Sequence, residues 1–258
     1  MIDTHCHLTD PRLGDQLDDV LKRSAANGVD RVITIATDPD DARAVVALCQ
    51  RRPNVRCVVG IHPNYTGEVT DADAALATLR ELHSDPTVVA LGEMGLDYFR
   101  NTAPRDVQRR FFEAQLALAT EFDKPVVIHS REAIADSLEV MRAFPGVRAI
   151  FHSFTGSPAE LRAIVDRGYT VGFTGPVTYK KNDALREAAR DCPIDQLVVE
   201  TDAPYLSPEP MRSQKINEPA LVVHVSRRIA ELKGMSYDAF DAATTANAER
   251  FFGLQSRA

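Results

Sequence analysis

Eight short apolar runs alternate with helical patterns along the whole chain. The runs are rich in β-branched residues and nearly continuous in apolar character, as is typical of parallel strands that are covered by helices on both faces. They lie at 1–8, 31–37, 55–63, 87–97, 125–130, 148–154, 169–175 and 196–204. This alternation is the strongest constraint on the fold, because it predicts repeated strand–helix units and a parallel sheet.

The segments between the runs carry helix boundary signals. Ser157, Pro158 and Glu160 supply an N-cap, a proline in the first turn and a capping-box acid, and Gly168 stands where a C-terminal cap belongs. Asp38–Pro39 opens another helix in the same way. These signals predict helices that begin shortly after the preceding strands end.

Eight such units in 258 residues match the size and rhythm of a (β/α)8 TIM barrel, an α/β fold. An open doubly wound sheet is the alternative. No strand is followed by G-x-G-x-x-G, and no G-x-x-x-x-G-K-[ST] occurs, so the nucleotide-binding versions of that sheet are disfavoured. No linker or charge block marks a domain boundary, and we expect a single domain over residues 1–258.

Composition narrows the class of protein. Hydrophobic residues make up 44% and charged residues 26%, as in an ordinary globular protein, and no apolar run approaches the roughly 20 residues of a membrane span. The net charge of −7 argues against nonspecific binding of duplex nucleic acid, which depends on cationic surfaces. The cysteines are scattered and form no C-x-x-C pair, which predicts reduced thiols in a cytoplasmic protein. They are Cys6, Cys49, Cys57 and Cys192. We expect no cleaved leader, because a candidate functional residue already stands at position 5.

Polar and ionisable residues collect at the C-terminal ends of the predicted strands. In a barrel these ends share one face, where the loops form the active site. Five of the seven histidines take part, together with several carboxylates, and we therefore expect a shared metal centre. The residues are His5, His7, His62, Glu93, Asp97, His129, His152, Glu200 and Asp202.

The stretch "DTHCHL" at 3–8 poses a separate question, because Cys6 lies between two histidines. Side chains alternate along a strand, so His5 and His7 point together into the barrel mouth and Cys6 points toward the helices. Cys6 is therefore predicted not to be a ligand. The other candidates offer only nitrogen and oxygen, which suit zinc, manganese or magnesium.

The number of candidate ligands predicts two metal ions. Four histidines and two carboxylates exceed the needs of one tetrahedral zinc, and structural zinc sites usually include cysteine. Two divalent ions bridged by a carboxylate can activate water and hold both oxygens of a displacement at phosphorus. The pattern favours catalysis.

The ordered motifs resemble those of the TatD family of metal-dependent hydrolases, within the amidohydrolase-like barrels. The resemblance extends through nearly the whole chain and includes a glutamate where related barrels often carry a carbamylated lysine. The motifs are "DTHCHL" at 3–8, "GIHP" at 60–63, "ALGEMGLDYF" at 90–99, "PVVIHSREA" at 125–133, "FHSFTG" at 151–156, "ETDAPYL" at 200–206, "NEPALV" at 217–222 and "NAERFFGL" at 247–254.

The resemblance implies six metal ligands, namely His5, His7, Glu93, His129, His152 and Asp202. The two histidines of the first strand would bind one ion with Asp202, and the two later histidines would bind the second. Glu93 would bridge both ions, and Asp202 would accept a proton from the attacking water. Both carboxylates are thus expected to be catalytic.

Three further residues have more than one interpretation. His62 either contacts a phosphate or a metal-bound water, or supports a ligand. Arg131 either pairs with a substrate phosphate or orients a ligand carboxylate. Glu200 shares a face with Asp202 deeper in the barrel, and we expect it to orient ligands.

The resemblance implies a divalent-metal-dependent phosphodiesterase, specifically a deoxyribonuclease that acts on single strands or frayed ends. Tyr179, Lys180 and Lys181 are the best candidates for binding such a substrate, because a cationic loop with an aromatic suits phosphates and unstacked bases. Other cations and aromatics of the strand-end loops are Arg100, Arg105, Arg212, Lys215, Tyr98, Phe99, Phe154 and Tyr205.

Other functions stay open at this point. A carbonyl hydrolase, such as an amidase or an aminoacyl-ester deacylase, could use the same activated water, and a non-catalytic metal-binding or partner-binding module is a third reading. We expect nucleic acid as the substrate, no membrane and no stable protein partner. The choice of DNA or RNA, of internal or terminal cleavage, and of resident metal is left open by the sequence.

Overall fold

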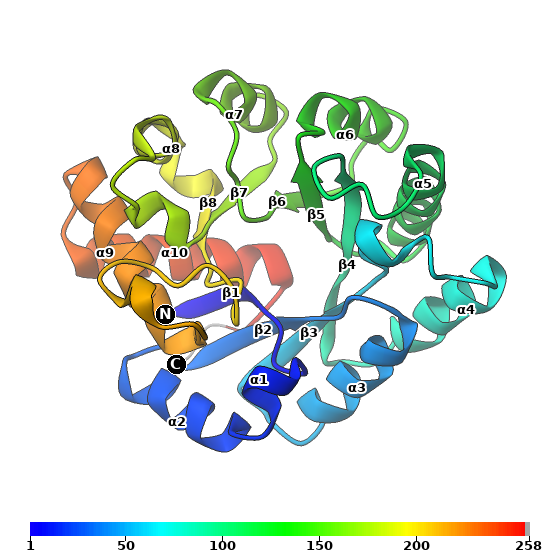
Figure 1. Cartoon of the computed structure of the whole chain (residues 1–258), viewed down its shortest axis with the longest axis horizontal. Coiled ribbons are helices and arrows are strands. Elements are labelled where there is room, and N and C mark those ends of the chain that lie inside the picture. Colours follow the sequence, from blue (N-terminus) through cyan, green and yellow to red (C-terminus); the bar gives the residue numbers. More distant parts are fainter. Residues whose placement is uncertain (256–258) are drawn as a thin grey trace. The chain divides into compact units, whose positions relative to one another are not determined.

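The computed structural model describes residues 1–255 and contains one parallel eight-stranded sheet (Figure 1). The strands follow one another in the order of the sequence, from β1 to β8. They are β1 (Ile2–Cys6), β2 (Arg31–Ile35), β3 (Val55–Val59), β4 (Val88–Asp97), β5 (Val126–Arg131), β6 (Ala149–Phe151), β7 (Thr170–Phe173) and β8 (Leu197–Val199).

Helices separate the strands, as the alternating pattern predicts. The α-helices are α1 (Pro11–Gly14), α2 (Leu17–Ala26), α3 (Pro39–Cys49), α4 (Ala72–Leu82), α5 (Arg105–Glu121), α6 (Ile134–Met141), α7 (Pro158–Val165), α8 (Asp183–Asp191), α9 (Val222–Lys233) and α10 (Tyr237–Phe252). Short 3-10 helices are η1 (Pro63–Tyr65), η2 (Gly175–Thr178), η3 (Ile194–Gln196), η4 (Met211–Ser213) and η5 (Pro219–Leu221). Within residues 1–255, none of these helices combines the length and apolar character of a membrane span.

The predicted helix starts are confirmed. Ser157 and Glu160 form a reciprocal capping box at the start of α7, with a proline in the first turn. Asp38 caps α3 by accepting hydrogen bonds from the amides of Asp40 and Asp41. The end of α7 differs slightly, because its C-cap is Asp166 and the left-handed glycine follows two residues later.

The strand order decides between the two predicted architectures. A doubly wound sheet reverses direction about an interior first strand, whereas a (β/α)8 barrel keeps the strands in sequence order. The observed order is sequential, and Cys6 at the end of β1 forms a parallel bridge with Ala203, just beyond β8. The fold class is the (β/α)8 TIM barrel.

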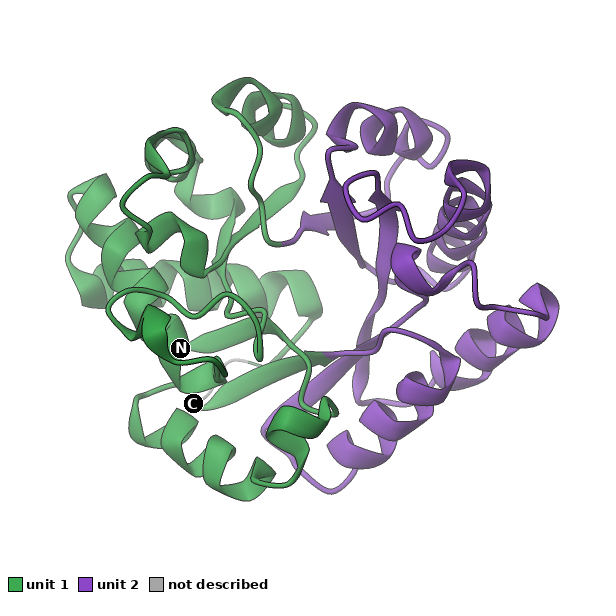
Figure 2. Cartoon of the chain, viewed as in Figure 1, with its two compact units in different colours: residues 1–34, 153–258 green, residues 35–152 purple. Residues whose placement is uncertain are grey.

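The chain divides into two compact units, coloured separately in Figure 2. Unit 1 contains residues 1–34 and the segment from Ser153 onward, and in it β1 pairs with β2 and β7 with β8. Unit 2 contains residues 35–152, with β3 paired to β4, β4 to β5, and β5 to β6. The expected single domain over 1–258 stays a prediction.

Gly95 is required by the pairing of β4 with β5 in unit 2. It lies opposite His129 with φ of +140°, and a Cβ atom there would stand 2.0 Å from the His129 carbonyl oxygen. We expect Gly95→Ala to lower the free energy of unfolding by about 3 kcal/mol, measured by chemical denaturation. Gly28→Ala is the matched control, because φ is also positive there but no atom lies within 4 Å. Its cost should be about 1 kcal/mol, and equal losses in the two variants would contradict the steric argument.

Candidate metal centre

In unit 1, two histidines and one aspartate converge near the C-terminal ends of β1 and β8. His5 lies within β1 and His7 immediately after it, and their ring centroids are 5.2 Å apart. The Nε2 atoms of His5 and His7 lie 3.8 Å and 3.5 Å from Asp202 Oδ1. The two histidines therefore share a side, as the strand alternation predicts.

The backbone around Asp202 is fixed from the β1 side. Asp202 has a φ of +56°, so its turn depends on specific hydrogen bonds. The buried Asp3 accepts hydrogen bonds from the Thr201 amide at 2.9 Å and from the Thr201 hydroxyl at 2.6 Å. Burial raises the pKa of Asp3 to about 8, although the hydrogen bonds from Thr201 and the His5 amide oppose that shift. Asp3 thus joins β1 to the Asp202 turn.

Asn217 fixes the same turn from its other side. Its buried Nδ2 donates to the carbonyl oxygens of Thr201 at 3.0 Å and of Tyr205 at 2.6 Å. Its backbone amide donates to the Pro204 carbonyl at 3.0 Å. The "NEP" motif that begins at 217 therefore positions the loop that carries Asp202.

Glu200 is fully buried in unit 1 beneath this loop. One carboxylate oxygen accepts the Ser153 amide at 2.5 Å, and the other accepts the Thr4 hydroxyl at 3.3 Å. The absence of a side chain at Gly172 makes room for the carboxylate, because a Cβ atom there would lie 2.5 Å from Oε2. These contacts suit the expected orienting role, which stays a prediction.

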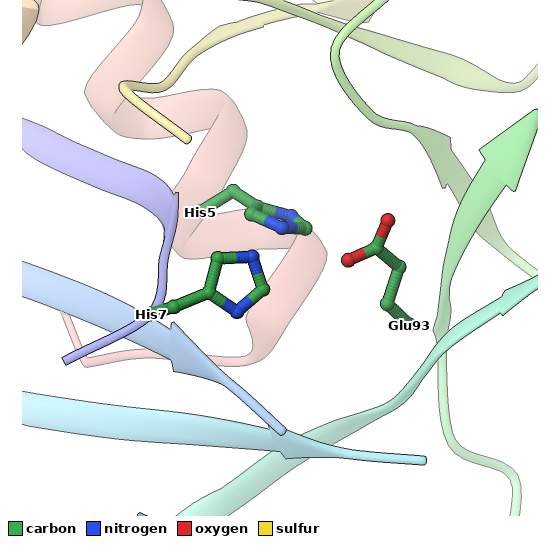
Figure 3. A group of neighbouring side chains, drawn as sticks. All are labelled: His5, His7 and Glu93. Atoms are coloured by element: carbon green, nitrogen blue, oxygen red, sulfur yellow. The ribbon is translucent and has the colours of Figure 1, made fainter. Parts of the chain in front are cut away.

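In unit 2, a single buried carboxylate gathers three histidines. Glu93 Oε1 lies 2.6 Å from His152 Nε2, 2.7 Å from His129 Nδ1 and 3.5 Å from His62 Nε2. One ligand atom each from His62, Glu93 and His129 lies within 4.8 Å of the others, a set that could hold a metal ion. Figure 3 draws Glu93 of β4, His5 of β1 and His7, which directly follows β1.

His129 lies between two carboxylates. Its Nδ1 faces Glu93, and its Nε2 lies 3.1 Å from Asp97 Oδ2. Burial lowers the pKa of His129, but the hydrogen bonds with Asp97 and Glu93 outweigh it and leave the pKa raised. Burial would raise the pKa of Asp97, yet hydrogen bonds from His129, the Arg100 amide and Asn64 lower it to about 2. The two carboxylates beside His129 therefore favour a positive charge at this position, and a site for a metal cation requires such surroundings.

His62 has its ring orientation set by its own loop. Its Nδ1 accepts a hydrogen bond from the Asn64 amide at 3.0 Å, where His62 is the N-cap of η1. Burial lowers the pKa of His62 to about 4, so the ring is neutral near pH 7. Because Nδ1 is the acceptor, the proton is on Nε2, which faces Glu93. This geometry favours the interpretation in which His62 supports a ligand carboxylate.

In unit 2, two buried glutamines of α5 hold the backbone just before His62 and at Asp97, the last residue of β4. Gln115 accepts from the Ile61 amide at 2.8 Å and donates to the Ile61 carbonyl at 3.1 Å. Gln108 does the same for the Asp97 amide and carbonyl, at 2.8 Å and 3.2 Å. The two are seven residues apart and so lie on one helix face. The repeated buried polar position in an amphipathic helix is the sequence signal that could have identified them.

Comparison with known proteins decides the family. A family model described as TatD related DNase matches residues 2–253. The chain belongs to the TatD family. The Bacillus subtilis relative named uncharacterized metal-dependent hydrolase YabD is 35% identical, with 98% of this chain and 99% of that protein covered. An Erwinia amylovora relative named 3'-5' ssDNA/RNA exonuclease TatD is 35% identical, with 98% and 100% covered. The crystal structure of the Escherichia coli TatD homolog YJJV superposes with a TM-score of 0.92 at 28% identity, covering 99% and 98% of the two chains.

The donor set of this TatD chain fits a divalent metal ion. In unit 2, imidazole nitrogens of His129 and His152 lie 2.7 Å and 2.6 Å from the Glu93 carboxylate. In unit 1, Nε2 of His7 lies 3.5 Å from the Asp202 carboxylate. Borderline and hard divalent cations accept this mixture of ligands.

Three residues expected to bind substrate, Tyr179, Lys180 and Lys181, directly follow η2 and are called the η2 loop here. Their environments differ. Lys180 and Lys181 are exposed. Tyr179 is partly buried, its hydroxyl donates to the Ser207 carbonyl at 3.0 Å, and the Arg212 guanidinium lies 4.0 Å from its ring centroid. One face of Tyr179 is thus already covered, so the lysines offer more to a polyanion than the tyrosine does.

Arg131 ends β5 in unit 2, and its guanidinium lies 5.1 Å from the ring centroid of Phe99. Phe99 is 61% exposed. Arg131 therefore stands beside an accessible aromatic ring two residues after His129, and its expected role in substrate binding stays a prediction.

Cys6 is fully buried, and its Sγ lies 3.6 Å from the Ile33 carbonyl oxygen on β2. Burial raises the pKa of the thiol well above its usual range, which disfavours a thiolate ligand. We expect Cys6→Ala to keep metal content and rate and to lose about 1 kcal/mol of stability. Metal analysis and thermal unfolding would check this, with His7→Ala as the variant that loses metal. A comparable loss of metal in both would refute the assignment.

Proposed function

We propose that the chain is a divalent-metal-dependent phosphodiesterase that hydrolyses single-stranded or frayed DNA. The observation that carries the proposal is the buried carboxylate of Glu93 in contact with three histidines, in a chain that a DNase family model matches almost from end to end. Relatives from Erwinia amylovora and Citrobacter rodentium are named 3'-5' ssDNA/RNA exonuclease TatD. Those names support a nucleic acid substrate for this chain.

We further propose two divalent ions per chain, of magnesium, manganese or zinc. One position would be built by His5, His7 and Asp202, whose ligand atoms meet in unit 1. The other would be built by His129 and His152, and Glu93 would bridge the two. The parallel sheet supports this arrangement, because all these residues lie in the C-terminal half of β1, β4 and β5 or just beyond β1, β6 and β8.

The two carboxylates have different access to water, and this suggests their roles. When bound, the ions supply Lewis-acid polarisation of the phosphate and make water more acidic. The Glu93 side chain is 2% exposed, whereas that of Asp202 is 15% exposed. Asp202 is therefore the carboxylate that can accept a proton from an attacking water, at Oδ1 or Oδ2. His62 Nε2 holds the Glu93 carboxylate, and Asp3 and Asn217 hold the Asp202 turn.

The deciding experiment is a substrate panel with metal stripped and restored. Purified protein would be treated with a chelator and reloaded with magnesium, manganese or zinc, and then assayed on single-stranded DNA, duplex DNA, RNA and an aminoacyl ester. We expect metal-restored cleavage that is fastest on single-stranded DNA, and end-labelled oligonucleotides would give its direction. Metal-dependent turnover of the acyl substrate alone would replace the proposal with a carbonyl hydrolase. Lack of any metal-dependent turnover would favour a non-catalytic module.

The exposed lysines of the η2 loop give a separate prediction. Lys180→Ala/Lys181→Ala is expected to keep both metals and the hydrolysis of bis-p-nitrophenyl phosphate, because the lysines are not among the proposed ligands. It should raise KM for a single-stranded oligonucleotide and flatten its dependence on salt, since two phosphate contacts are lost. Lys22→Ala on α2, whose side chain is 77% exposed, is the control. An unchanged oligonucleotide KM and salt slope would place the substrate path elsewhere.

We also propose a cytoplasmic location. Cys6, Cys49, Cys57 and Cys192 are present as buried thiols. Reduced thiols are typical of proteins in a reducing compartment. Fractionation of cells that express the chain would test this.

A further inference from the structure

Tyr205 in unit 1 is an exposed aromatic residue next to the proposed metal ligands. Its side chain is 44% exposed, and its ring centroid lies 6.2 Å from that of His7 in an edge-on arrangement. Its amide donates to the Asp202 carbonyl at 2.9 Å, and its carbonyl accepts from Asn217 at 2.6 Å. The ring is therefore held in place by a fixed backbone, close to His7 and three residues after Asp202.

Arg12 of α1 lies against the same ring. Its guanidinium carbon is 4.4 Å from the Tyr205 ring centroid. Asp10 holds the guanidinium with two hydrogen bonds, from Nε at 2.9 Å and from Nη2 at 2.7 Å, and also caps α1 by accepting the Arg12 amide. A guanidinium has five N–H donors, more than Asp10 and Tyr205 can occupy, so Arg12 is oriented and can still donate to a phosphate.

The location of exposed aromatic rings in the described residues supports a ligand role. Among residues 1–255 the exposed large hydrophobic side chains are Tyr65, Phe99, Tyr205 and Ile216. The three aromatic ones all lie in the connections that follow strands β3, β4 and β8, and Tyr65 is the last residue of η1. Loops at this end of a (β/α)8 barrel bind substrate, and exposed rings there suit the stacking of unpaired bases.

We propose that Tyr205 and Arg12 bind one nucleotide of a single-stranded substrate next to the scissile phosphodiester. Tyr205 stacks on the base, and Arg12 donates hydrogen bonds to the adjoining phosphate. The inference rests on the proposed nuclease function and adds a site for the base. The proposed base site is distinct from the η2 loop. In that loop Arg212 covers one face of the Tyr179 ring, and the Tyr179 hydroxyl donates a hydrogen bond to the Ser207 carbonyl.

The test compares variants on two oligonucleotides of equal charge, one with all bases and one with an abasic terminal nucleotide. Tyr205→Ala should raise KM for the complete oligonucleotide about 10-fold or more, with kcat and metal content within twofold of the parent. Its KM for the abasic oligonucleotide should change less than twofold. Tyr205→Phe keeps the ring and should restore the parent KM. Ile216→Ala, which is also 44% exposed in the parent, is the control for lost apolar surface.

The role of Arg12 is tested by a separate measurement, the dependence of KM on salt concentration. Arg12→Ala should raise KM for both oligonucleotides and reduce the slope of log KM against log salt by about one phosphate contact. Equal KM values for Tyr205→Ala and the parent, or an equal loss on the abasic substrate, would overturn the base site. If the parent itself cleaves neither oligonucleotide with any metal, the proposed function fails. Fluorescence anisotropy with a labelled single strand then decides the base site, which is refuted if the parent and Tyr205→Ala bind it equally.

Discussion

Glu93→Gln is expected to lower the occupancy of both proposed metal positions and to reduce phosphodiester hydrolysis by about a thousandfold. Glu93 is 2% exposed, and its Oε1 faces His129, His152 and His62. Glutamine keeps the size of the side chain but removes the negative charge that a bridging ligand supplies to two cations. Metal-ion catalysis is worth several kcal/mol, and about 4 kcal/mol corresponds to about a thousandfold in rate.

The measurement is elemental analysis of desalted protein together with rates on a single-stranded oligonucleotide. Circular dichroism would show whether the variant is folded. Glu68→Gln in the exposed segment after η1 is the control, because it makes the same chemical change away from the histidines. Two fully occupied metal positions in folded Glu93→Gln would exclude a bridging role.

The fold could be predicted from the sequence because its signals are local. Every predicted strand is present, and strand length is the main difference, since β6 and β8 have only three residues each. The predicted runs at 148–154 and 196–204 also include the apolar and polar residues that follow the strands. They include His152, Glu200 and Asp202, whose amides still donate to the carbonyl oxygens of Ile128, Phe173 and His5 on neighbouring strands. An apolar run therefore marks where a strand lies but not where its regular pairing ends.

The supporting residues of the site could not be predicted in the same way. Asp3 meets Thr201 across 198 positions of the sequence, and Gln115 meets Ile61 across 54. Such contacts depend on which loops the fold brings together. The spacing of buried polar residues on α5 can mark Gln115 as unusual, but it does not identify the segment that Gln115 holds. His5 and His7 were accessible to prediction because strand alternation alone places them on one side.

The η2 loop shows a related difference. The sequence indicates that Tyr179 offers a stacking surface, but in the structure Arg212 and the Ser207 carbonyl engage that residue within unit 1. Tyr205 was only one aromatic among several in the sequence. Its exposure and its contact with Arg12 distinguish it, and both are tertiary properties.

Asp202→Asn is expected to reduce kcat on single-stranded DNA by about 100-fold to 10,000-fold, with a much smaller change in KM. Asparagine keeps the size of the side chain and a carbonyl oxygen near His5 and His7, but it cannot accept a proton from water at neutral pH. The turn should persist, because Asp3 and Asn217 hold its backbone rather than its carboxylate. Metal should be lost in part, and only from the position that His5 and His7 build.

Two matched variants separate proton transfer by Asp202 from a general effect of lost charge. Asp195→Asn changes an exposed aspartate of η3 and should leave kcat unchanged. Glu200→Gln removes a buried charge beneath the same loop, and its effect should appear in stability and metal content, because its carboxylate is fully buried among Ser153, Thr4 and Gly172. Supplying saturating metal should therefore restore much of the rate of Glu200→Gln but not that of Asp202→Asn. If excess metal restores Asp202→Asn to the parent kcat, Asp202 is only a ligand and another group accepts the proton.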